Sequence, residues 1–156
     1  MRKLFHFDVS PQVYTADACV ITCFDARFDL AVRKFLKRRC IFTYDNLKIP
    51  GSGKWLASPE CDAGRDCLLQ MVRTSIERHH AERAVIIGHN ECGAYTAPSP
   101  EAITADVLRA ADVLRTAEPA LSVETYFADF DGIYEIGTEL KSSDIEVVPA
   151  IRRGVK

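Results

Sequence analysis

Three residues with chemically useful side chains follow an apolar run in the segment ITCFDARF (21–28). Cys23, Asp25 and Arg27 stand at alternate positions in this segment. A thiolate at such a place can bind a metal ion, and an opposite-charge pair beside it can adjust the charge around that metal. The alternative is a strand that reaches the surface and ends in an ordinary salt bridge, which contributes only about 0–1 kcal/mol to stability.

A second group of candidate ligands lies in the segment GHNECG (88–93). His89 and Cys92 are three residues apart, a spacing that allows one turn to present both side chains to one metal ion. With Cys23 they supply two thiolates and one imidazole, which zinc accepts in tetrahedral geometry. Three protein ligands leave a fourth position open, as is typical of catalytic zinc. Taken alone, His-x-x-Cys also fits a packed or surface pair.

The order of elements explains how these residues could meet. Alternation of apolar strands with amphipathic helices predicts a three-layer α/β fold, in which helices flank a central, mostly parallel β-sheet. Ligands of such sheets bind beyond the carboxyl ends of the strands, where Cys23 and His89 both fall. We expect strand 18–24, helix 28–39, strand 40–45, loop 47–60, helix 63–80, a strand within 83–92, helix 98–117 capped by Ser99, and strands 122–130 and 132–137.

The composition narrows the class of protein. The 156 residues, 47% hydrophobic and 27% charged, are expected to form one globular domain over 1–156. A net charge of -2 gives no reason to expect nucleic acid or a membrane surface as a partner. No apolar run approaches the ~20 residues of a membrane span, and the first residues lack the apolar core of a signal peptide. We therefore expect a cytoplasmic protein.

The other cysteines and histidines are expected to have structural or incidental roles. Cys19 and Cys40 lie in strand patterns and are most simply core residues. Cys61 and Cys67 bracket the segment DAGRD, but no histidine or third cysteine lies at a spacing that would support a metal site. The sequence has no Cys-x-x-Cys motif, so a thiol redox enzyme is a distant alternative. His79, at a helix end, could in principle carry protons, although nothing supports that role.

Taken together, the two motifs resemble those of the β-class carbonic anhydrases. The family's Cys-x-Asp-x-Arg motif is similar to residues 23–27, and its His-x-x-Cys-Gly motif is similar to residues 89–93. The resemblance extends from about residue 18 to residue 140 and includes an ending at 131–140 that is similar to the family's last strands. It implies a β-carbonic anhydrase-like fold and a homodimer or dimer-based oligomer with active sites near the subunit interface.

The resemblance also implies roles for individual residues. Cys23, His89 and Cys92 would hold one zinc ion per chain, and Asp25 and Arg27 would form a catalytic dyad beside it. Zinc lowers the pKa of a bound water, so that hydroxide is available near neutrality to convert carbon dioxide into bicarbonate. Asp25 would accept a hydrogen bond from that hydroxide, and Arg27 would offset the carboxylate charge.

One segment departs from the family pattern. The family commonly has an Arg-Asn-Ala-Gly-like stretch after its second strand, whereas this chain has YDNLKIPG at 44–51. The substrate therefore stays open. Related proteins hydrolyse carbon disulfide or carbonyl sulfide, and a non-catalytic zinc-binding protein is a further alternative. Tyr44 and Trp55 would either line the entrance or pack the loop, and Glu91, between two ligands, is expected to be solvated.

Overall fold

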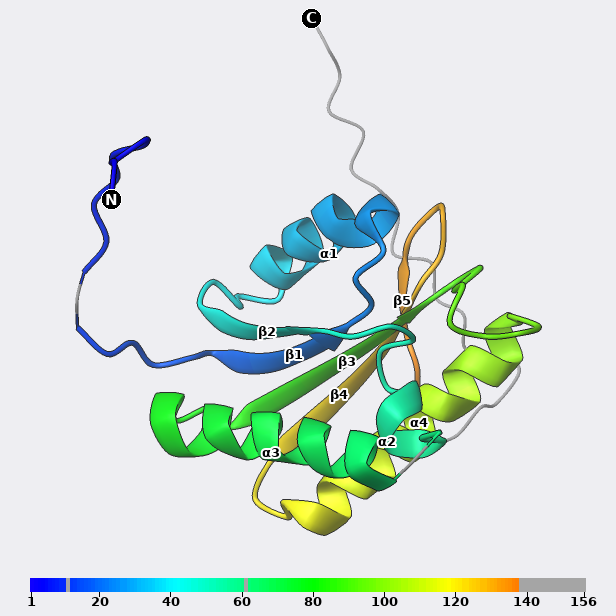
Figure 1. Ribbon diagram of the computed structural model, residues 1–156. Coiled ribbons are helices and arrows are strands. Elements are labelled where there is room, and N and C mark those ends of the chain that lie inside the picture. Colours follow the sequence, from blue (N-terminus) through cyan, green and yellow to red (C-terminus); the bar gives the residue numbers. More distant parts are fainter. Residues whose placement is uncertain (11, 61, 138–156) are drawn as a thin grey trace, which may run out of the picture.

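Five strands form one sheet at the centre of the described fold (Figure 1). The computed structural model describes residues 1–10, 12–60 and 62–137. Within these ranges the strand order is β2-β1-β3-β4-β5, and only β5 runs antiparallel to its neighbour. The predicted mostly parallel sheet is confirmed. The strands are β1 (Ala18–Thr22), β2 (Tyr44–Lys48), β3 (Arg83–His89), β4 (Ser122–Ala128) and β5 (Ile133–Glu135).

Helices cover both faces of the sheet, which confirms the predicted α/β class. Figure 1 shows α1 on one face and α2, α3 and α4 on the other. The start of α4 follows its sequence signals, because Ser99 accepts a hydrogen bond from the backbone N–H of Ala102 and proline occupies the first helical position. The helices are α1 (Ala26–Arg38), α2 (Lys54–Ala57), α3 (Asp62–His79) and α4 (Pro100–Ala117).

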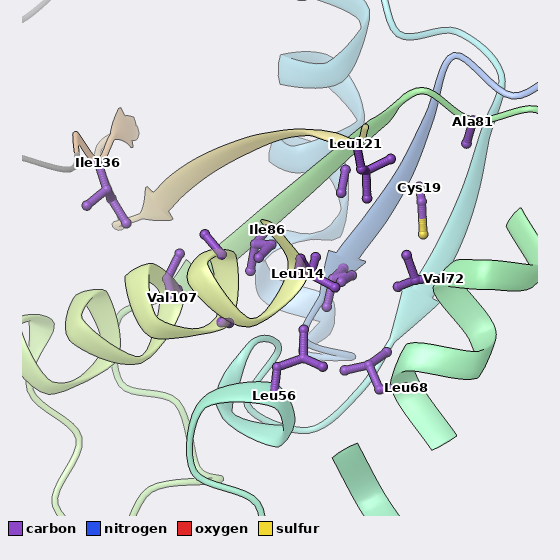
Figure 2. Packing of buried hydrophobic residues seen from close by; sticks show 14 of the residues in the cluster. Cys19, Leu56, Leu68, Val72, Ala81, Ile86, Val107, Leu114, Leu121 and Ile136 are labelled. Carbon is purple, nitrogen blue, oxygen red and sulfur yellow. The ribbon is translucent and has the colours of Figure 1, made fainter. Parts of the chain in front are cut away.

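Alternate residues of the central strands supply the two halves of the core. In β1, Cys19 and Ile21 pack toward α2, α3 and α4, whereas Ala18 and Val20 pack toward α1. All five residues of β1 are buried, as expected for a strand covered on both faces. Figure 2 shows the larger half of the core, which includes Leu56 of α2, Leu68 and Val72 of α3, and Leu114 of α4.

The second strand begins later than the sequence pattern indicates. We expected a strand over 40–45, but β2 spans Tyr44–Lys48. The backbone N–H of Ile41 donates to the carbonyl of Leu36 at 2.9 Å, and Cys40 takes a left-handed conformation with φ 57°, which ends α1. This turn buries Ile41 and exposes Cys40, so the expectation that Cys40 is a core residue was wrong.

The segment 47–60, expected to be a loop, contains the end of a strand and a short helix. Strand β2 continues to Lys48, and the short helix α2 follows. Between them, the buried Ser52 hydroxyl donates to the carbonyl of Ile21 at 3.0 Å. A Cβ atom on Gly53 would lie 2.9 Å from the Cβ of Ala110, so α2 packs closely on α4. The segment is thereby fixed against the end of β1.

Two expectations fall outside the described residues. They concern Cys61 and the tail 141–156, for which the sequence leaves an edge strand or a subunit contact open. Among the residues that are described, no helix combines the length and the apolar character that a membrane crossing requires.

Gly88 allows α4 to pack on β3 directly beside the predicted ligand His89. A Cβ atom at this position would lie 2.7 Å from Ile103 Cγ2 and 2.9 Å from Val107 Cγ2. We expect Gly88→Ala to lower the free energy of unfolding by about 1–3 kcal/mol through overpacking. Urea denaturation should show this loss. Gly93→Ala is the matched control because, apart from its two chain neighbours, no described residue has an atom within 4 Å of the added Cβ. Equal stability of both variants would contradict the prediction.

Candidate metal centre

The three predicted ligands converge at the carboxyl ends of β1 and β3. Cys23 follows β1, His89 ends β3, and Cys92 lies on the next turn. Their candidate ligand atoms all lie within 4.8 Å of one another, and the two sulfur atoms are 3.9 Å apart. The parallel pairing of β1 with β3 brings these residues together although 66 positions separate Cys23 from His89. This group could hold a metal ion.

The imidazole of His89 has one nitrogen in use and one free. Its Nδ1 lies 2.8 Å from the carbonyl oxygen of Asn90. A carbonyl oxygen can only accept, so Nδ1 carries the proton and Nε2 presents its lone pair. Nε2 is buried and has no hydrogen-bond partner among the described residues. A buried lone pair beside two thiols fits a metal ion, because ligating histidines commonly donate their other nitrogen to a carbonyl.

The turn that carries His89 and Cys92 is fixed by Asn90. The Asn90 side chain donates to Asp129 at 2.9 Å and accepts from the backbone N–H of Glu91 at 2.8 Å. Glu91 itself has φ 51°, an uncommon conformation for a residue with a side chain. The hydrogen bonds of Asn90 thus support a tight turn that places both ligands on the same side.

The two thiols influence one another strongly. The hydrogen bond from Cys92 lowers the pKa of Cys23 to about 4. The same contact with Cys23 raises the pKa of Cys92, and burial acts in the same direction. Without a cation the pair therefore favours one thiolate and one thiol. A divalent metal would allow both to ionise, because a coordinating thiol is deprotonated.

Asp25 and Arg27 form a close pair beside this group. Asp25 is the N-cap of α1 and accepts the backbone N–H of Arg27 at 3.0 Å. The Arg27 side chain donates from Nε to both carboxylate oxygens at 3.1 Å and from Nη2 to Oδ2 at 2.7 Å. These hydrogen bonds lower the pKa of Asp25 to about 2. The two side chains thus lie in direct contact.

The comparisons with known proteins decide the family. A family model described as "Putative carbonic anhydrase" matches residues 14–136. The chain belongs to this carbonic anhydrase family. A protein of Rickettsia conorii named "Uncharacterized protein RC0076" is 25% identical over 139 residues, which cover 81% of this chain and 75% of that protein.

Solved carbonic anhydrases share the fold of this family member at low sequence identity. The enzyme from Streptococcus mutans matches with a TM-score of 0.63 and 16% identity, covering 85% of this chain and 89% of that one. A tetrameric β-carbonic anhydrase from Sordaria macrospora matches with a TM-score of 0.55 and 15% identity over 80% and 82% of the two chains. A carbon disulfide hydrolase matches with a TM-score of 0.54 and 11% identity over 89% of each chain. These likenesses show the fold.

A pocket opens beside the candidate ligands of this carbonic anhydrase family member. Its lining includes Cys23, His89 and Asp25, so it reaches the ligand group itself. Much of the remaining lining comes from α1 and β2. Sequence reasoning foresaw only Tyr44 among the residues of β2 in this lining. The further lining residues from the two elements are Phe28, Asp29, Val32 and Arg33 of α1, and Asn46 and Lys48 of β2.

Several other residues considered from the sequence lie outside the candidate ligand group. Trp55 packs on α3, where a Cβ added to Gly64 would lie 2.9 Å from its ring, and it is not part of the pocket lining. His79 contacts the carboxylate of Asp45 at 2.8 Å and stacks on Tyr14, which ties the segment before β1 to α3. Cys67 is exposed on α3. None of these side chains takes part in the ligand group.

Two contacts of Arg27 were missed from the sequence. Glu91 is solvated as expected, with 65% of its side chain exposed, but it also contacts the guanidinium through its backbone carbonyl and its carboxylate. The ring of Phe130 also lies against the guanidinium. Glu91 is 64 residues from Arg27 and Phe130 is farther still, so no local spacing signals either contact.

The pKa of Asp25 provides a test of the Asp25–Arg27 geometry. Because folding lowers this pKa, the pair stabilises the fold fully above about pH 4 and loses its effect as the pH falls toward about 2. In metal-free Arg27→Ala we expect the Asp25 pKa to rise from about 2 toward its usual value. Carbon-13 NMR titration of the carboxyl groups would measure the change. Asp17, whose pKa is lowered mainly by backbone N–H groups of Thr43 and Phe42, should not move.

Proposed function

We propose that this chain is a zinc-dependent carbonic anhydrase that interconverts carbon dioxide and bicarbonate. Cys23, His89 and Cys92 would hold one zinc ion per chain. The observation that carries the proposal is the convergence of two thiols on the buried, unpartnered Nε2 of His89. Zinc, when bound there, would supply hydroxide near neutral pH by lowering the pKa of a coordinated water.

Asp25 and Arg27 would control the charge and orientation of the attacking group. The carboxylate of Asp25 can accept a hydrogen bond from the attacking hydroxide and so orient the lone pair of that hydroxide toward the substrate. Without a compensating cation, the negative charge of the same carboxylate would oppose ionisation of a zinc-bound water. The bidentate contact with Arg27 offsets that charge and occupies the carboxylate oxygens. We infer that the pair acts as a unit.

The pocket lining supports a small, uncharged substrate. Next to the ligand group the wall contains Phe28, Val32, Ile87 and Ala128, all of which present apolar atoms. An apolar wall of this kind favours carbon dioxide over a hydrated ion, since a charged group would lose its water there. The same lining also contains the charged residues Asp29 and Lys48, which form an ion pair that links α1 to β2.

A second candidate is hydrolysis of carbon disulfide or carbonyl sulfide at the same centre. The fold likeness to a carbon disulfide hydrolase supports it, as does the β2 segment that departs from the family pattern. Carbon disulfide is also linear and uncharged, so the apolar wall suits either molecule. A non-catalytic zinc-binding role is the remaining alternative.

We also propose that the chain acts in the cytoplasm as a homodimer or dimer-based oligomer. The resemblance to the β-class enzymes supports this assembly, and one enzyme of similar fold is described as tetrameric. Exposed apolar side chains at Phe24 and Leu30 near the candidate centre are consistent with a partner surface.

Removal of one ligand tests the zinc assignment. We expect Cys23→Ala to lose most of its zinc, because only two protein ligands remain. Cys67→Ala should retain about one zinc per chain, since Cys67 is exposed on α3 and outside the ligand group. Metal analysis of the purified variants by mass spectrometry would measure both. Full zinc occupancy in Cys23→Ala would refute the assignment.

The pH dependence of carbon dioxide hydration tests the role of the Asp25–Arg27 pair. Activity should rise with pH, with a midpoint above the value of about 7 that zinc held by three histidines gives, because two thiolates donate negative charge. Arg27→Ala should reduce activity at neutral pH by about 10- to 100-fold at equal zinc content. Stopped-flow hydration measured from about pH 6 to about pH 9.5, a range that brackets the expected midpoint, would give both profiles.

Arg78→Ala is the matched control for this measurement, because Arg78 is exposed in the last turn of α3. Its profile should overlay that of the parent. A profile of Arg27→Ala that also overlays the parent would show that the pair has no part in the chemistry. A zinc-loaded parent that hydrolyses carbon disulfide but does not hydrate carbon dioxide would establish the second candidate.

A further inference from the structure

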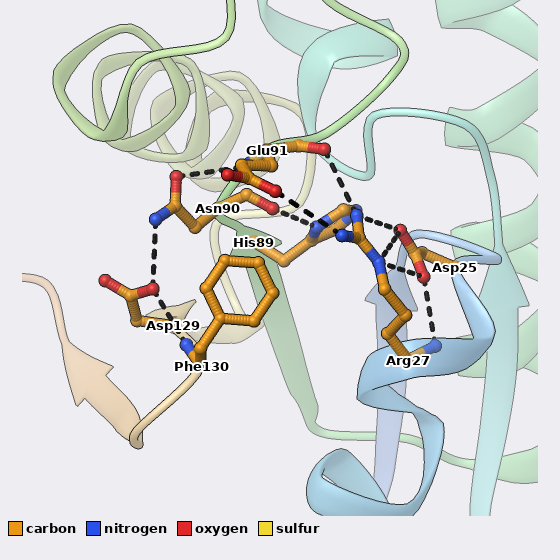
Figure 3. A network of polar contacts seen from close by, with 7 residues as sticks. All are labelled: Asp25, Arg27, His89, Asn90, Glu91, Asp129 and Phe130. Atoms are coloured by element: carbon orange, nitrogen blue, oxygen red, sulfur yellow. Dashed lines mark hydrogen bonds and ion pairs between the residues drawn. The ribbon is translucent and has the colours of Figure 1, made fainter.

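Arg27 contacts more than its partner Asp25. Its Nη2 donates both to Asp25 and to the backbone carbonyl of Glu91, the latter at 3.2 Å. Its Nη1 lies 3.5 Å from the Glu91 carboxylate. All three guanidinium nitrogens are therefore engaged, two of them with the turn that carries His89 and Cys92 (Figure 3).

Aromatic rings complete the surroundings of the guanidinium. The Arg27 Cζ atom lies 5.7 Å from the ring centroid of Phe28 and 5.6 Å from that of Phe130. Both distances are within the range of cation–π attraction. Phe28 is a buried core residue, whereas Phe130 is 58% exposed. Burial in the core accounts for Phe28, whereas the exposed Phe130 lies against both the Phe28 ring, at 5.6 Å between centroids, and the Arg27 guanidinium.

A set of hydrogen bonds links the backbone at Glu91 to the backbone at Phe130. Asp129 Oδ1 accepts from the Asn90 side chain at 2.9 Å and from the backbone N–H of Phe130 at 2.7 Å. Asn90 in turn accepts the N–H of Glu91 at 2.8 Å. Figure 3 shows this chain of contacts running from the loop after β4, through the ligand-bearing turn, to Arg27 and Asp25. The loop and the turn are thus linked on the side that faces Arg27.

We propose that Glu91 and Phe130 are positioning residues that hold the Arg27 guanidinium on the carboxylate of Asp25. This inference rests on the proposed role of the Asp25–Arg27 pair. The Arg27 side chain is 49% exposed, so its five-donor head would otherwise be free to move into solvent. Each movement away would leave the Asp25 carboxylate uncompensated beside the candidate zinc ligands.

The size of the effect follows from the exposure of the contacts. An exposed ion pair or an exposed cation–π contact shifts an equilibrium by about two- to fivefold. Loss of the Glu91 charge or of the Phe130 ring should therefore increase the fraction of detached Arg27 by that factor. Loss of both should increase it about tenfold, if the two contacts add.

The experiment measures Arg27 directly. The variants are Glu91→Gln, which retains the backbone carbonyl, and Phe130→Leu, which retains apolar volume; Phe130→Tyr retains the aromatic face. Nitrogen-15 NMR gives the hydrogen-exchange rate of the Arg27 Nε–H in protein of measured zinc content, with Arg27→Lys identifying the signal. Controls are Glu77→Gln and Phe42→Leu, exposed residues outside this network.

We expect exchange about two- to fivefold faster in Glu91→Gln and Phe130→Leu, and parent-like rates in Phe130→Tyr and both controls. Thermal unfolding should change little for Glu91→Gln, which separates positioning from general stability. Parent-like exchange in both Glu91→Gln and Phe130→Leu would overturn the inference, as would equal acceleration in the controls. The measurement does not depend on catalysis. If the unmodified protein fails to hydrate carbon dioxide, the proposed function is refuted, but the exchange rates still test the positioning of Arg27.

Discussion

The lone pair of His89 Nε2 lies buried between elements that leave it no partner among the described residues, and much of the local structure is arranged around it. An unpartnered buried polar atom costs about 1–3 kcal/mol. The other ring nitrogen cannot relieve this, because it already donates to Asn90. A cation among His89, Cys23 and Cys92 would accept the lone pair of this nitrogen. It would also allow both thiols to ionise at this close distance. A metal-binding group accounts for the arrangement better than ordinary core packing does.

A second constraint comes from the need to balance charge around that group. Arg27 is the cation that joins three separate segments: the start of α1, the ligand-bearing turn and the loop after β4. Each segment supplies a different kind of contact, namely a carboxylate, a carbonyl and an aromatic face. The three contacts together hold the half-exposed guanidinium in place, since any one exposed contact is weak. The electrostatics of the centre therefore depend on tertiary structure well outside the two sequence motifs.

The sequence was sufficient for the features that local patterns encode. Apolar runs such as ACVIT specified the central strands, and the capping residue Ser99 specified the start of α4. The ligand group followed because parallel strands align their carboxyl ends. The start of β2 was misplaced because Cys40, not glycine, takes the left-handed turn after α1. The contacts of Glu91 and Phe130 with Arg27 depend on how loops fold back, which neither propensity nor spacing encodes.

Strand β2 has different roles on its two sides. Tyr44, Asn46 and Lys48 contribute to the pocket wall, whereas Asp45 is tied to α3 through Ser75 and His79. None of the five β2 residues belongs to the ligand group, and β2 has one strand neighbour in the described sheet. The β2 part of the pocket wall and the candidate ligand group thus lie on separate parts of the fold. Evolution, or a protein engineer, could replace the pocket-side residues of this edge strand and change which small molecules the pocket admits, while the candidate ligand group stays the same.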